Sequence, residues 1–407
     1  MVYLWEEREE AVMSKMSKRS EVRSLKSVIG YQLSVINKLK LFTVHCSLFT
    51  VCCLLLTAYC LLFTMPAIAE ESAIKLYPIP SQRSFPSAIT VDAKGQVWFL
   101  ELNVNKIAMF QPETSAFLEY DIPTAKSYPT DIVVDANGVL WFTEQDGNQI
   151  GRFDPKTKTF KEYEIPTIGS QPIRLAVDGS GNIWFTEFAA NKIGRLDVTK
   201  GSIKEYDIPT PLSQPLGIAV DVTFRVWFIE TQANKLAVLS PATGKFQEYP
   251  IPSAFSAPNE IAVDKNGNIW FSERINRKLV KFSPATEQFK TFDIPSRGVP
   301  EGITADKKGS IWYCDKRGGK VGRLDPAKRE FIELDIALSN GQPLDIAIDA
   351  ANGVWFTEIG ANNIGRLDIS NTALKGYQPA KLSVELNADQ RKMVMPNSEL
   401  KNEQKNP

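Results

Sequence analysis

Carboxylates recur at one fixed place along most of this chain, three residues after a tryptophan. The seven residues at this place are Glu101, Glu144, Glu187, Glu230, Glu273, Asp315 and Glu358. Oxygen ligands of this kind suit a hard cation, so the set could hold a metal ion or a cationic ligand. A residue that recurs in every unit also suits one repeated structural task, such as accepting backbone N–H bonds from a loop. We favour the structural task, because a single active centre requires departures from the repeat.

Such departures concentrate in the units that contain Trp270 and Trp312. There the usual small or neutral residues give way to charged and aromatic ones, and an arginine stands out in an earlier unit. The candidate ligand residues are Arg174, Glu260, Arg274, Arg277, Tyr313, Lys316 and Arg317. We expect them to form a rim of mixed charge that binds a small molecule, a peptide or a glycan.

Histidine and cysteine are too scarce for several common kinds of site. The only histidine in the chain is His45, and four of the five cysteines lie within residues 1–69. The remainder therefore lacks Ser-His and Cys-His nucleophilic pairs and histidine-ligated metals. Its single Cys314 has no partner for an intramolecular disulfide, and we expect it to be a small buried apolar residue.

The elements that position these residues follow from the tryptophan spacing. Trp98, Trp141, Trp184, Trp227, Trp270, Trp312 and Trp355 are 43 residues apart, with one step of 42. Each unit contains four short β-branched and aromatic runs, separated by Asp, Asn, Gly and Pro, which we name strands a, b, c and d. Four strands in each of seven units predict an all-β, seven-bladed β-propeller.

Closure and connectivity can also be predicted. The run 74–80 resembles a d strand without a, b or c before it, so we expect it to complete blade seven as its outer strand. Residues 373–377 are a rival for that place. In an antiparallel meander the start of strand a and the loop after strand b share one end of the blade. We therefore expect the candidate residues to meet around the central channel.

The ends of the chain differ from the propeller, which we assign to residues 70–379. Residues 41–69 carry no charge, follow a basic stretch and end in Ala-Ile-Ala, which is typical of a secretory signal cleaved after Ala69. We expect export to the periplasm or the extracellular space, or membrane anchoring if the apolar run is not cleaved. Residues 380–407 are polar, lack the repeat and are expected to be disordered.

Charge limits the partners that residues 70–407 can have. They hold 39 basic and 42 acidic residues, which argues against the strongly basic face that nucleic acids require. We expect a monomer that binds neither nucleic acid nor an anionic membrane.

The repeated pattern Gly-x-Ile-Trp-Phe-Thr-Glu, followed by Asn-Lys-Ile-Gly-Arg-Leu, resembles the virginiamycin B lyase (streptogramin lyase) family over nearly all of residues 74–370. The resemblance implies a carbon–oxygen lyase that linearises a cyclic depsipeptide by β-elimination with the help of Mg²⁺. It also implies a histidine base directly after the leading proline of blade six, assisted by an acid after that blade's tryptophan. In this chain Glu301 follows Pro300, and Asp315 stands at the assisting position.

Three hypotheses follow. The first is an exported propeller that binds a ligand at its rim with little or no catalysis. The second is a Mg²⁺-dependent lyase with Glu301 as base, assisted by Asp315, and with Glu273, Asp315 and Glu358 as metal ligands. The third is a scaffold for envelope proteins that interacts through its blade edges. The absent histidine favours the first hypothesis.

Overall fold

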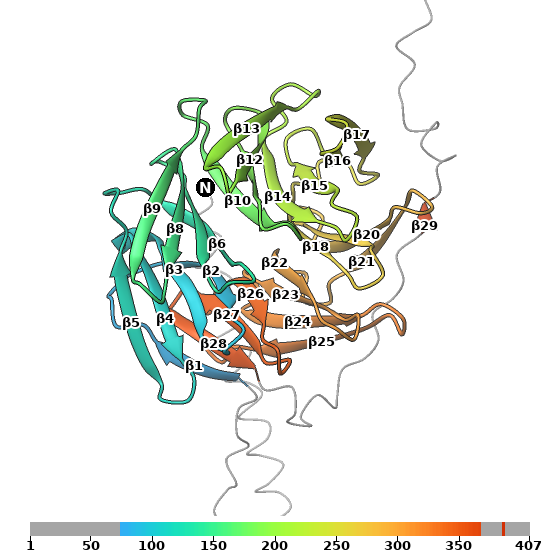
Figure 1. Cartoon of the computed structure of the whole chain (residues 1–407). Helices are drawn as coiled ribbons and strands as arrows, with labels where there is room; N and C mark the ends of the chain where they lie inside the picture. The colour runs from blue at the N-terminus through green and yellow to red at the C-terminus, as the bar shows by residue number, and fades with distance from the viewer. Residues whose placement is uncertain (1–73, 368–384, 387–407) are drawn as a thin grey trace, which may run out of the picture. The chain divides into compact units, whose positions relative to one another are not determined.

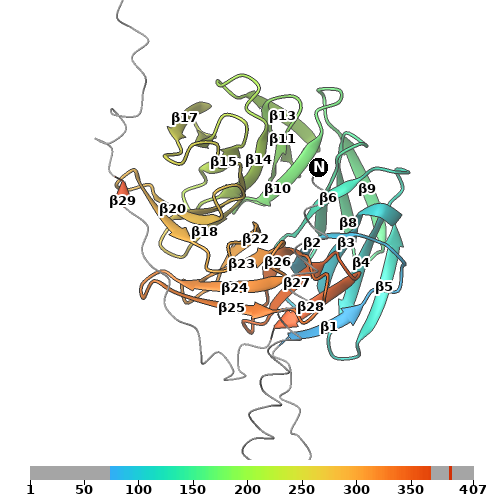
Figure 2. The same cartoon turned by 180° about the vertical axis from the view of Figure 1, so that it is seen from behind.

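The computed structural model describes residues 74–367 and 385–386. In this part of the chain, strands β1 to β28 form seven four-stranded antiparallel sheets, which surround one centre as the blades of a propeller (Figures 1 and 2). The predicted fold is therefore confirmed. Figure 1 shows strand a of each blade next to the centre and strand d at the periphery.

The two inner strands of each blade begin and end at equivalent residues. The a strands are β2 (Pro86–Val91), β6 (Pro129–Val134), β10 (Pro172–Val177), β14 (Pro215–Val220), β18 (Pro258–Val263), β22 (Pro300–Ala305) and β26 (Pro343–Ile348). The b strands are β3 (Val97–Glu101), β7 (Leu140–Glu144), β11 (Ile183–Glu187), β15 (Val226–Glu230), β19 (Ile269–Glu273), β23 (Ile311–Asp315) and β27 (Val354–Glu358). The b strands are buried along their whole length.

The two outer strands complete each blade. The c strands are β4 (Lys106–Gln111), β8 (Gln149–Asp154), β12 (Lys192–Asp197), β16 (Lys235–Ser240), β20 (Lys278–Ser283), β24 (Lys320–Asp325) and β28 (Asn363–Leu367). The d strands are β5 (Ala116–Asp121), β9 (Thr159–Glu164), β13 (Ser202–Asp207), β17 (Lys245–Pro250), β21 (Gln288–Asp293), β25 (Glu330–Asp335) and β1 (Ile74–Pro78). A single 3-10 turn, η2 (Leu102–Val104), follows β3 in the described residues.

Blade seven is closed by the N-terminal strand, as predicted. β1 pairs antiparallel with β28, with Ile74 opposite Leu367 and Pro78 opposite Asn363. Because the two ends of the propeller share one sheet, neither leaves an unpaired inner edge. The rival segment 373–377 lies outside the described residues.

The turns between strands a and b are built on one aspartate in each blade. In blade one the Asp92 carboxylate accepts the backbone N–H groups of Lys94 and Gln96 and the indole N–H of Trp98. Gly95 takes a positive φ of 79°, which glycine adopts without a steric cost. This turn fixes the tryptophan near the start of strand b. Because the same turn recurs in every blade, the tryptophans are evenly spaced along the chain.

The hydrophobic core lies between adjacent blades. Trp98 of blade one packs with Leu140, Phe142 and Phe153 of blade two in one buried cluster. The other blades repeat this arrangement, so each tryptophan is almost completely buried. The large aromatic surface buried between blades is the main source of their cohesion.

Two predictions concern residues outside the propeller. Of the tail 380–407, residues 385 and 386 form the short strand β29 (Glu385–Leu386), which pairs with β21. The rest of that tail and residues 1–69 lie outside the described residues. Within the described part of the chain, no helix is both long and apolar enough to cross a membrane.

Candidate ligand-binding face and central channel

The loops that connect d to a and b to c lie at one end of the blades, and we call this end the loop face. An asparagine holds the loops of neighbouring blades together there. Asn105 Oδ1 accepts hydrogen bonds from Ser127 N and Oγ at 2.9 and 3.0 Å. Asn362 does the same for Ser84, so this contact also links blade seven to blade one. The opposite end, built from the a–b and c–d turns, is called the turn face.

The repeated carboxylates lie directly beneath the loop face and are fully buried. Burial raises the pKa of Glu144, Glu187 and Glu230 to about 8, and a second glutamate on strand d adds to the effect. Burial also raises the pKa of Glu101 and Glu273 to about 7. These groups are therefore partly or mostly protonated at neutral pH.

Blades six and seven use the same position differently. Asp315 Oδ1 accepts the N–H groups of Val299 and Gly318, each at 2.8 Å. Glu358 accepts the N–H groups of Gln342, Gly360 and Ala361. Both carboxylates thus accept backbone N–H groups of the loops next to them. This is the structural task that the sequence suggested for all seven carboxylates.

The residues present do not fit a shared magnesium ion. Glu273, Asp315 and Glu358 lie in three different blades, and each is enclosed beneath its own loops. Among the described residues, no group of three His, Cys, Asp or Glu side chains is placed so that it could hold a metal ion. The described residues therefore offer no evident centre for the metal that the family resemblance implies.

Glu301, at the place where the resemblance predicts the base, is buried and engaged. Its Oε2 accepts hydrogen bonds from Arg274 Nε and Nη2 at 2.8 and 2.5 Å and from Asn259 Nδ2 at 3.1 Å. Asp315 is directed to its own loop, so the two acids are not linked by any described hydrogen bond. The structure instead joins Glu301 of blade six to Arg274 of blade five.

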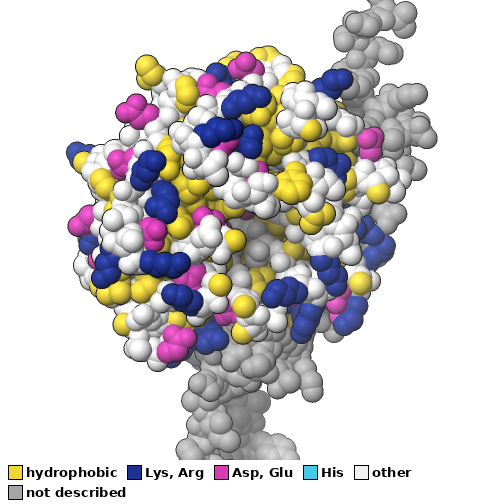
Figure 3. All heavy atoms as spheres, viewed as in Figure 1, with side chains coloured by type: hydrophobic (Ala, Val, Ile, Leu, Met, Phe, Trp, Pro, Cys, Tyr) yellow, Lys and Arg dark blue, Asp and Glu magenta, His cyan; other side chains and the backbone are white. Residues whose placement is uncertain are grey.

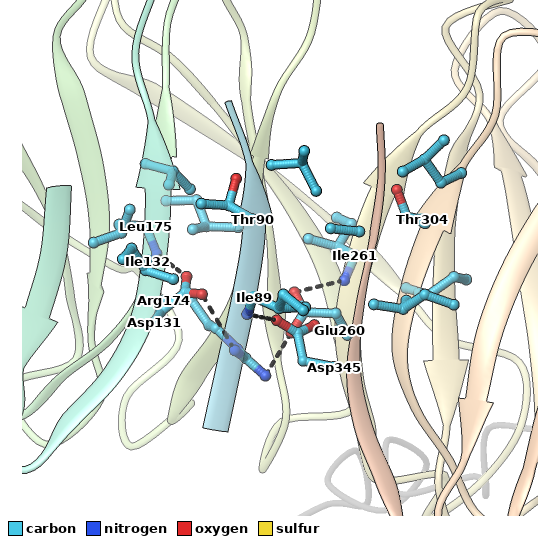
Figure 4. A pocket seen from close by; sticks show the side chains of 17 residues that line it. Ile89, Thr90, Asp131, Ile132, Arg174, Leu175, Glu260, Ile261, Thr304 and Asp345 are labelled. Atoms are coloured by element: carbon cyan, nitrogen blue, oxygen red, sulfur yellow. Dashed lines mark hydrogen bonds and ion pairs between the residues drawn. The ribbon is translucent and has the colours of Figure 1, made fainter. Parts of the chain in front are cut away.

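Arg174 lies across the central channel and connects three blades (Figure 4). Its guanidinium is 2.7 Å from Glu260 Oε2 and 3.4 Å from Asp131 Oδ1. Burial raises the pKa of Asp131 to about 7, although the positive charge of Arg174 opposes this change. Burial also raises the pKa of Asp345, to about 6. The channel thus holds one arginine among several acidic groups.

The channel contains a cavity of about 320 Å³. Arg174 and its acidic neighbours line it together with Thr90, Thr304 and aliphatic residues of the a strands. Asp131 and Asp345 also accept the backbone N–H groups of Leu175 and Ile89 in the following blades. Sequence reasoning did not select these two aspartates, although their polarity on an otherwise apolar strand was a usable signal.

The other predicted rim residues lie in different surroundings. Lys316 and Arg317 line a cavity of about 370 Å³ on the loop face, between blades six and seven. Arg277 is exposed and takes the positive-φ turn position that asparagine holds in most blades. Tyr313 is not on the rim. It is fully buried in blade six, and its hydroxyl donates to Glu333. Cys314 is also fully buried, as expected, and burial raises its pKa.

An arc of exposed apolar side chains completes the loop face. Ile168, Leu212, Phe255 and Ile275 come from the loops of blades three, four and five, with exposed fractions between 64% and 94%. Figure 3 shows acidic and basic side chains interspersed over the side that it displays. Exposed apolar groups gathered near a concave region are typical of a binding surface.

Fold and site together define a seven-bladed propeller with exposed apolar side chains on its loop face and an ion-paired arginine in its channel. Comparison with known proteins places it more narrowly. The sequence profile of the Virginiamycin B lyase family matches residues 64–281 and 180–384, and the chain belongs to this family. A search of curated proteins found no match.

Three solved structures illustrate the relationship. A streptogramin B lyase is 30% identical, with a TM-score of 0.69 over 72% of this chain and 97% of that one. Virginiamycin B lyase from Staphylococcus aureus is 29% identical, with a TM-score of 0.68 over 72% of this chain and 98% of that one. A catalytically inactive histidine-to-alanine variant of the same enzyme, solved with quinupristin, gives the same values.

Proposed function

We propose that this protein binds a ligand on its loop face and does not carry out the β-elimination expected of catalytic members of the family. The environment of Glu301 carries the proposal. A general base needs an oxygen directed at the proton that it removes. Glu301 is buried and its Oε2 is held by Arg274 and Asn259. The chain's only histidine, His45, lies outside the propeller.

The loop face suits a ligand that has both apolar side chains and hydrogen-bond-accepting oxygens. Phe255 and Ile275 of blade five offer exposed apolar surface, and Lys316 and Arg317 of blade six line a cavity between blades six and seven. A peptide-like molecule could bury apolar side chains on the first pair and place carbonyl oxygens near the second. The S. aureus relative solved with quinupristin supports a ligand of peptide size.

Two parts of the proposal rest on the sequence. We propose that the protein acts outside the cytoplasm, because residues 41–69 have the composition of a secretory signal. We also propose a monomer, because radial closure leaves only the short outer edges of the blades for a second copy to extend. Light scattering on the purified protein would test the monomer.

The experiment uses the purified protein without a histidine tag and quinupristin as the probe, with and without Mg²⁺. Binding is measured by calorimetry, and chromatography detects any linear product. We expect saturable binding and no product. Phe255→Ser with Ile275→Ser should weaken binding about tenfold or more, because both side chains lose apolar contact.

Val222→Ser is the matched control, because Val222 is equally exposed but belongs to the turn face. It should leave binding unchanged. Product that requires Mg²⁺ and disappears in Glu301→Gln would contradict the proposal and establish the lyase hypothesis. Absence of any binding to the wild-type protein would contradict a ligand of this chemistry.

A further inference from the structure

One row of side chains runs across the same surface of every blade, near the turn face. It consists of the tryptophan of strand b, the residue opposite it on strand c and the residue opposite that on strand d. In blade two these are Trp141, Arg152 and Lys161. The Arg152 guanidinium lies 5.9 Å from the Trp141 ring, and Lys161 Nζ lies 4.5 Å from the Tyr163 ring. The two cations cover aromatic surface that would otherwise face the space between blades.

Most other blades keep at least one such cation. Blades three and seven repeat the arginine and lysine, blade five has two lysines and blade six has an arginine. The pairs on strands c and d of these blades are Arg195 with Lys204, Arg366 with Lys75, Lys281 with Lys290, and Arg323 with Ile332. In blade four, Arg225 comes from the turn between strands a and b, and its guanidinium lies 5.1 Å from the centroid of the Trp227 ring.

Blade one departs from this rule. Its Trp98 lies opposite Met109, and Met109 lies opposite Leu118. Both cations are therefore replaced by apolar side chains, and no arginine or lysine is found over the Trp98 ring in the described residues. Leu118 is 44% exposed, which is unusual for a leucine on a strand of this protein. The aromatic surface of blade one is thus left with an apolar cover.

A cavity of about 370 Å³ lies at this place, between blades one and two on the turn face. Its floor is formed by Trp98, Met109, Leu118 and Tyr120, and the Trp98 and Tyr120 rings stack at 6.2 Å. We call this cavity the blade-one groove. Its size falls within the range of sites for small organic ligands.

The border of the blade-one groove is basic. Lys94 comes from the a–b turn of blade one, and Lys156 and Lys158 come from the c–d turn of blade two. In the described part of the chain, none of these three ammonium groups forms an ion pair. The nearby Asp92 carboxylate is occupied by Trp98 Nε1 and two backbone N–H groups. The groove therefore combines an apolar floor with uncompensated positive charge.

We propose that the blade-one groove binds a small organic carboxylate with an aromatic or short alkyl body. The body would lie on Met109, Leu118 and the Trp98–Tyr120 stack, and its carboxylate would meet the ammonium groups of Lys156 and Lys158. A neutral apolar ligand would make no use of the lysines, and a polyanion would make no use of the floor. The groove opens on the turn face, so it is separate from the site proposed on the loop face.

The test uses the purified full chain and three probes of one shape, followed by calorimetry. They are 4-phenylbutyrate, the neutral 4-phenylbutan-1-ol and the cationic 4-phenylbutylamine. We expect saturable binding of the carboxylate, weaker binding of the alcohol and none of the amine. Lys156→Gln with Lys158→Gln should weaken binding of the carboxylate about fivefold and leave that of the alcohol nearly unchanged, because the charge is removed while part of the alkyl stem remains.

Met109→Arg with Leu118→Lys restores the arrangement of blades two and three and should abolish binding of both the carboxylate and the alcohol. Val238→Arg with Gln247→Lys adds the same charges to the same row of blade four and should leave binding intact. Circular dichroism and the melting temperature establish that each variant is folded. Equal binding by the wild type and the Met109→Arg/Leu118→Lys protein would overturn the proposal, as would failure of the wild type to bind 4-phenylbutyrate at millimolar concentration. If the Met109→Arg/Leu118→Lys protein does not fold, the variant with both Lys156 and Lys158 replaced provides the test. Unchanged affinity of that variant for 4-phenylbutyrate would also overturn the proposal.

Discussion

At the scale of single residues, the seven buried carboxylates occupy two electrostatic environments. In blades two, three and four the partner on strand d is itself a glutamate, namely Glu162, Glu205 or Glu248, and repulsion from it adds to the effect of burial. In blade seven the equivalent place on strand d is Leu76, and Glu358 accepts three backbone N–H bonds. One residue type at one position thus stores a proton in some blades and holds a loop in others.

Glu187→Gln should stabilise the protein at alkaline pH. The folded-state pKa of Glu187 is about 8, above the value near 4.5 of an unfolded chain. The folded state therefore binds more protons between these values, and stability falls as pH rises from about 5 to 8. Glutamine removes this loss, so unfolding by urea at pH 8.5 should require on the order of 1–3 kcal/mol more than in the wild type, and little more at pH 5.

Lys192 and Glu205 also face Glu187 and remain in the variant, so the comparison isolates one carboxyl group. Glu358→Gln is the matched control. Its carboxylate is a hydrogen-bond acceptor for three N–H groups, so the substitution should destabilise the protein by about 1–3 kcal/mol at both pH values. A destabilising Glu187→Gln at pH 8.5 would show that the Glu187 carboxylate is ionised and satisfied.

The candidate catalytic pair shows the limit of sequence reasoning at this scale. The separation of Glu301 and Asp315 follows from the repeat, and both lie where the meander predicts. The hydrogen-bond partners of the two acids cannot be predicted from the repeat, because Arg274 contacts Glu301 from the neighbouring blade. A cross-blade contact depends on side-chain conformation and loop height, which a spacing pattern does not contain.

At the scale of elements, the middle of strand c is matched to the aromatic residue opposite it on strand b. A Cβ atom built on Gly194 would lie 2.1 Å from the Phe185 ring, and Gly151 and Gly365 have the same relation to Phe142 and Phe356. These glycines therefore allow the ring to lie flat on the strand. The recurring Ile-Gly-Arg sequence reflects this packing rather than a turn.

Gly194→Ala should therefore destabilise the protein by about 1–3 kcal/mol, the usual cost of overpacking a buried site. The melting temperature followed by tryptophan fluorescence would measure it. Ala237→Gly, at the equivalent position of blade four, is the reverse change and should cost about 1–2 kcal/mol, through backbone freedom and the loss of a buried methyl group. A neutral or stabilising Gly194→Ala would mean that the Phe185 ring can move aside.

At the scale of elements, the sequence predicts the positions of the strands well. A proline begins each a strand, Asp-x-x-Gly marks most a–b turns, and the structure has its strands between these signals. Blade four shows what the pattern could not predict. Phe224 takes the positive-φ place of the glycine in its a–b turn, and its ring contacts Gly179 of blade three. That contact between blades holds a conformation that local preference alone would reject.

At the scale of the whole molecule, Arg174 connects blades on both sides of the channel. Arg174→Met should destabilise the protein by about 3–5 kcal/mol at pH 8, because Glu260 and Asp131 lose their buried counter-charge. The loss should be smaller at pH 5, since Asp131 and Asp345 have pKa values raised to about 7 and about 6 and take up protons as pH falls. Urea unfolding at the two pH values measures the difference.

Arg366→Met serves as the control for this substitution. Arg366 lies over the Trp355 ring on the side of a blade, 5.3 Å from its centroid. Its loss should cost about 1 kcal/mol or less at either pH, because a partly exposed cation–π contact is weak. If Arg174→Met behaves in the same way, the channel ion pairs contribute little to holding the blades together.

The sequence by itself determined the number of blades and the order of their strands, and it favoured the N-terminal strand as the one that closes the ring. Those features depend on periodic burial and on turn chemistry, which are local and repeat seven times. Only the tertiary structure decided that Glu301 pairs with Arg274, that Arg174 forms ion pairs across the channel and that a groove opens beside Trp98. The physical reason is that each of these depends on side chains from different blades, whose contacts are set by how the blades pack against one another.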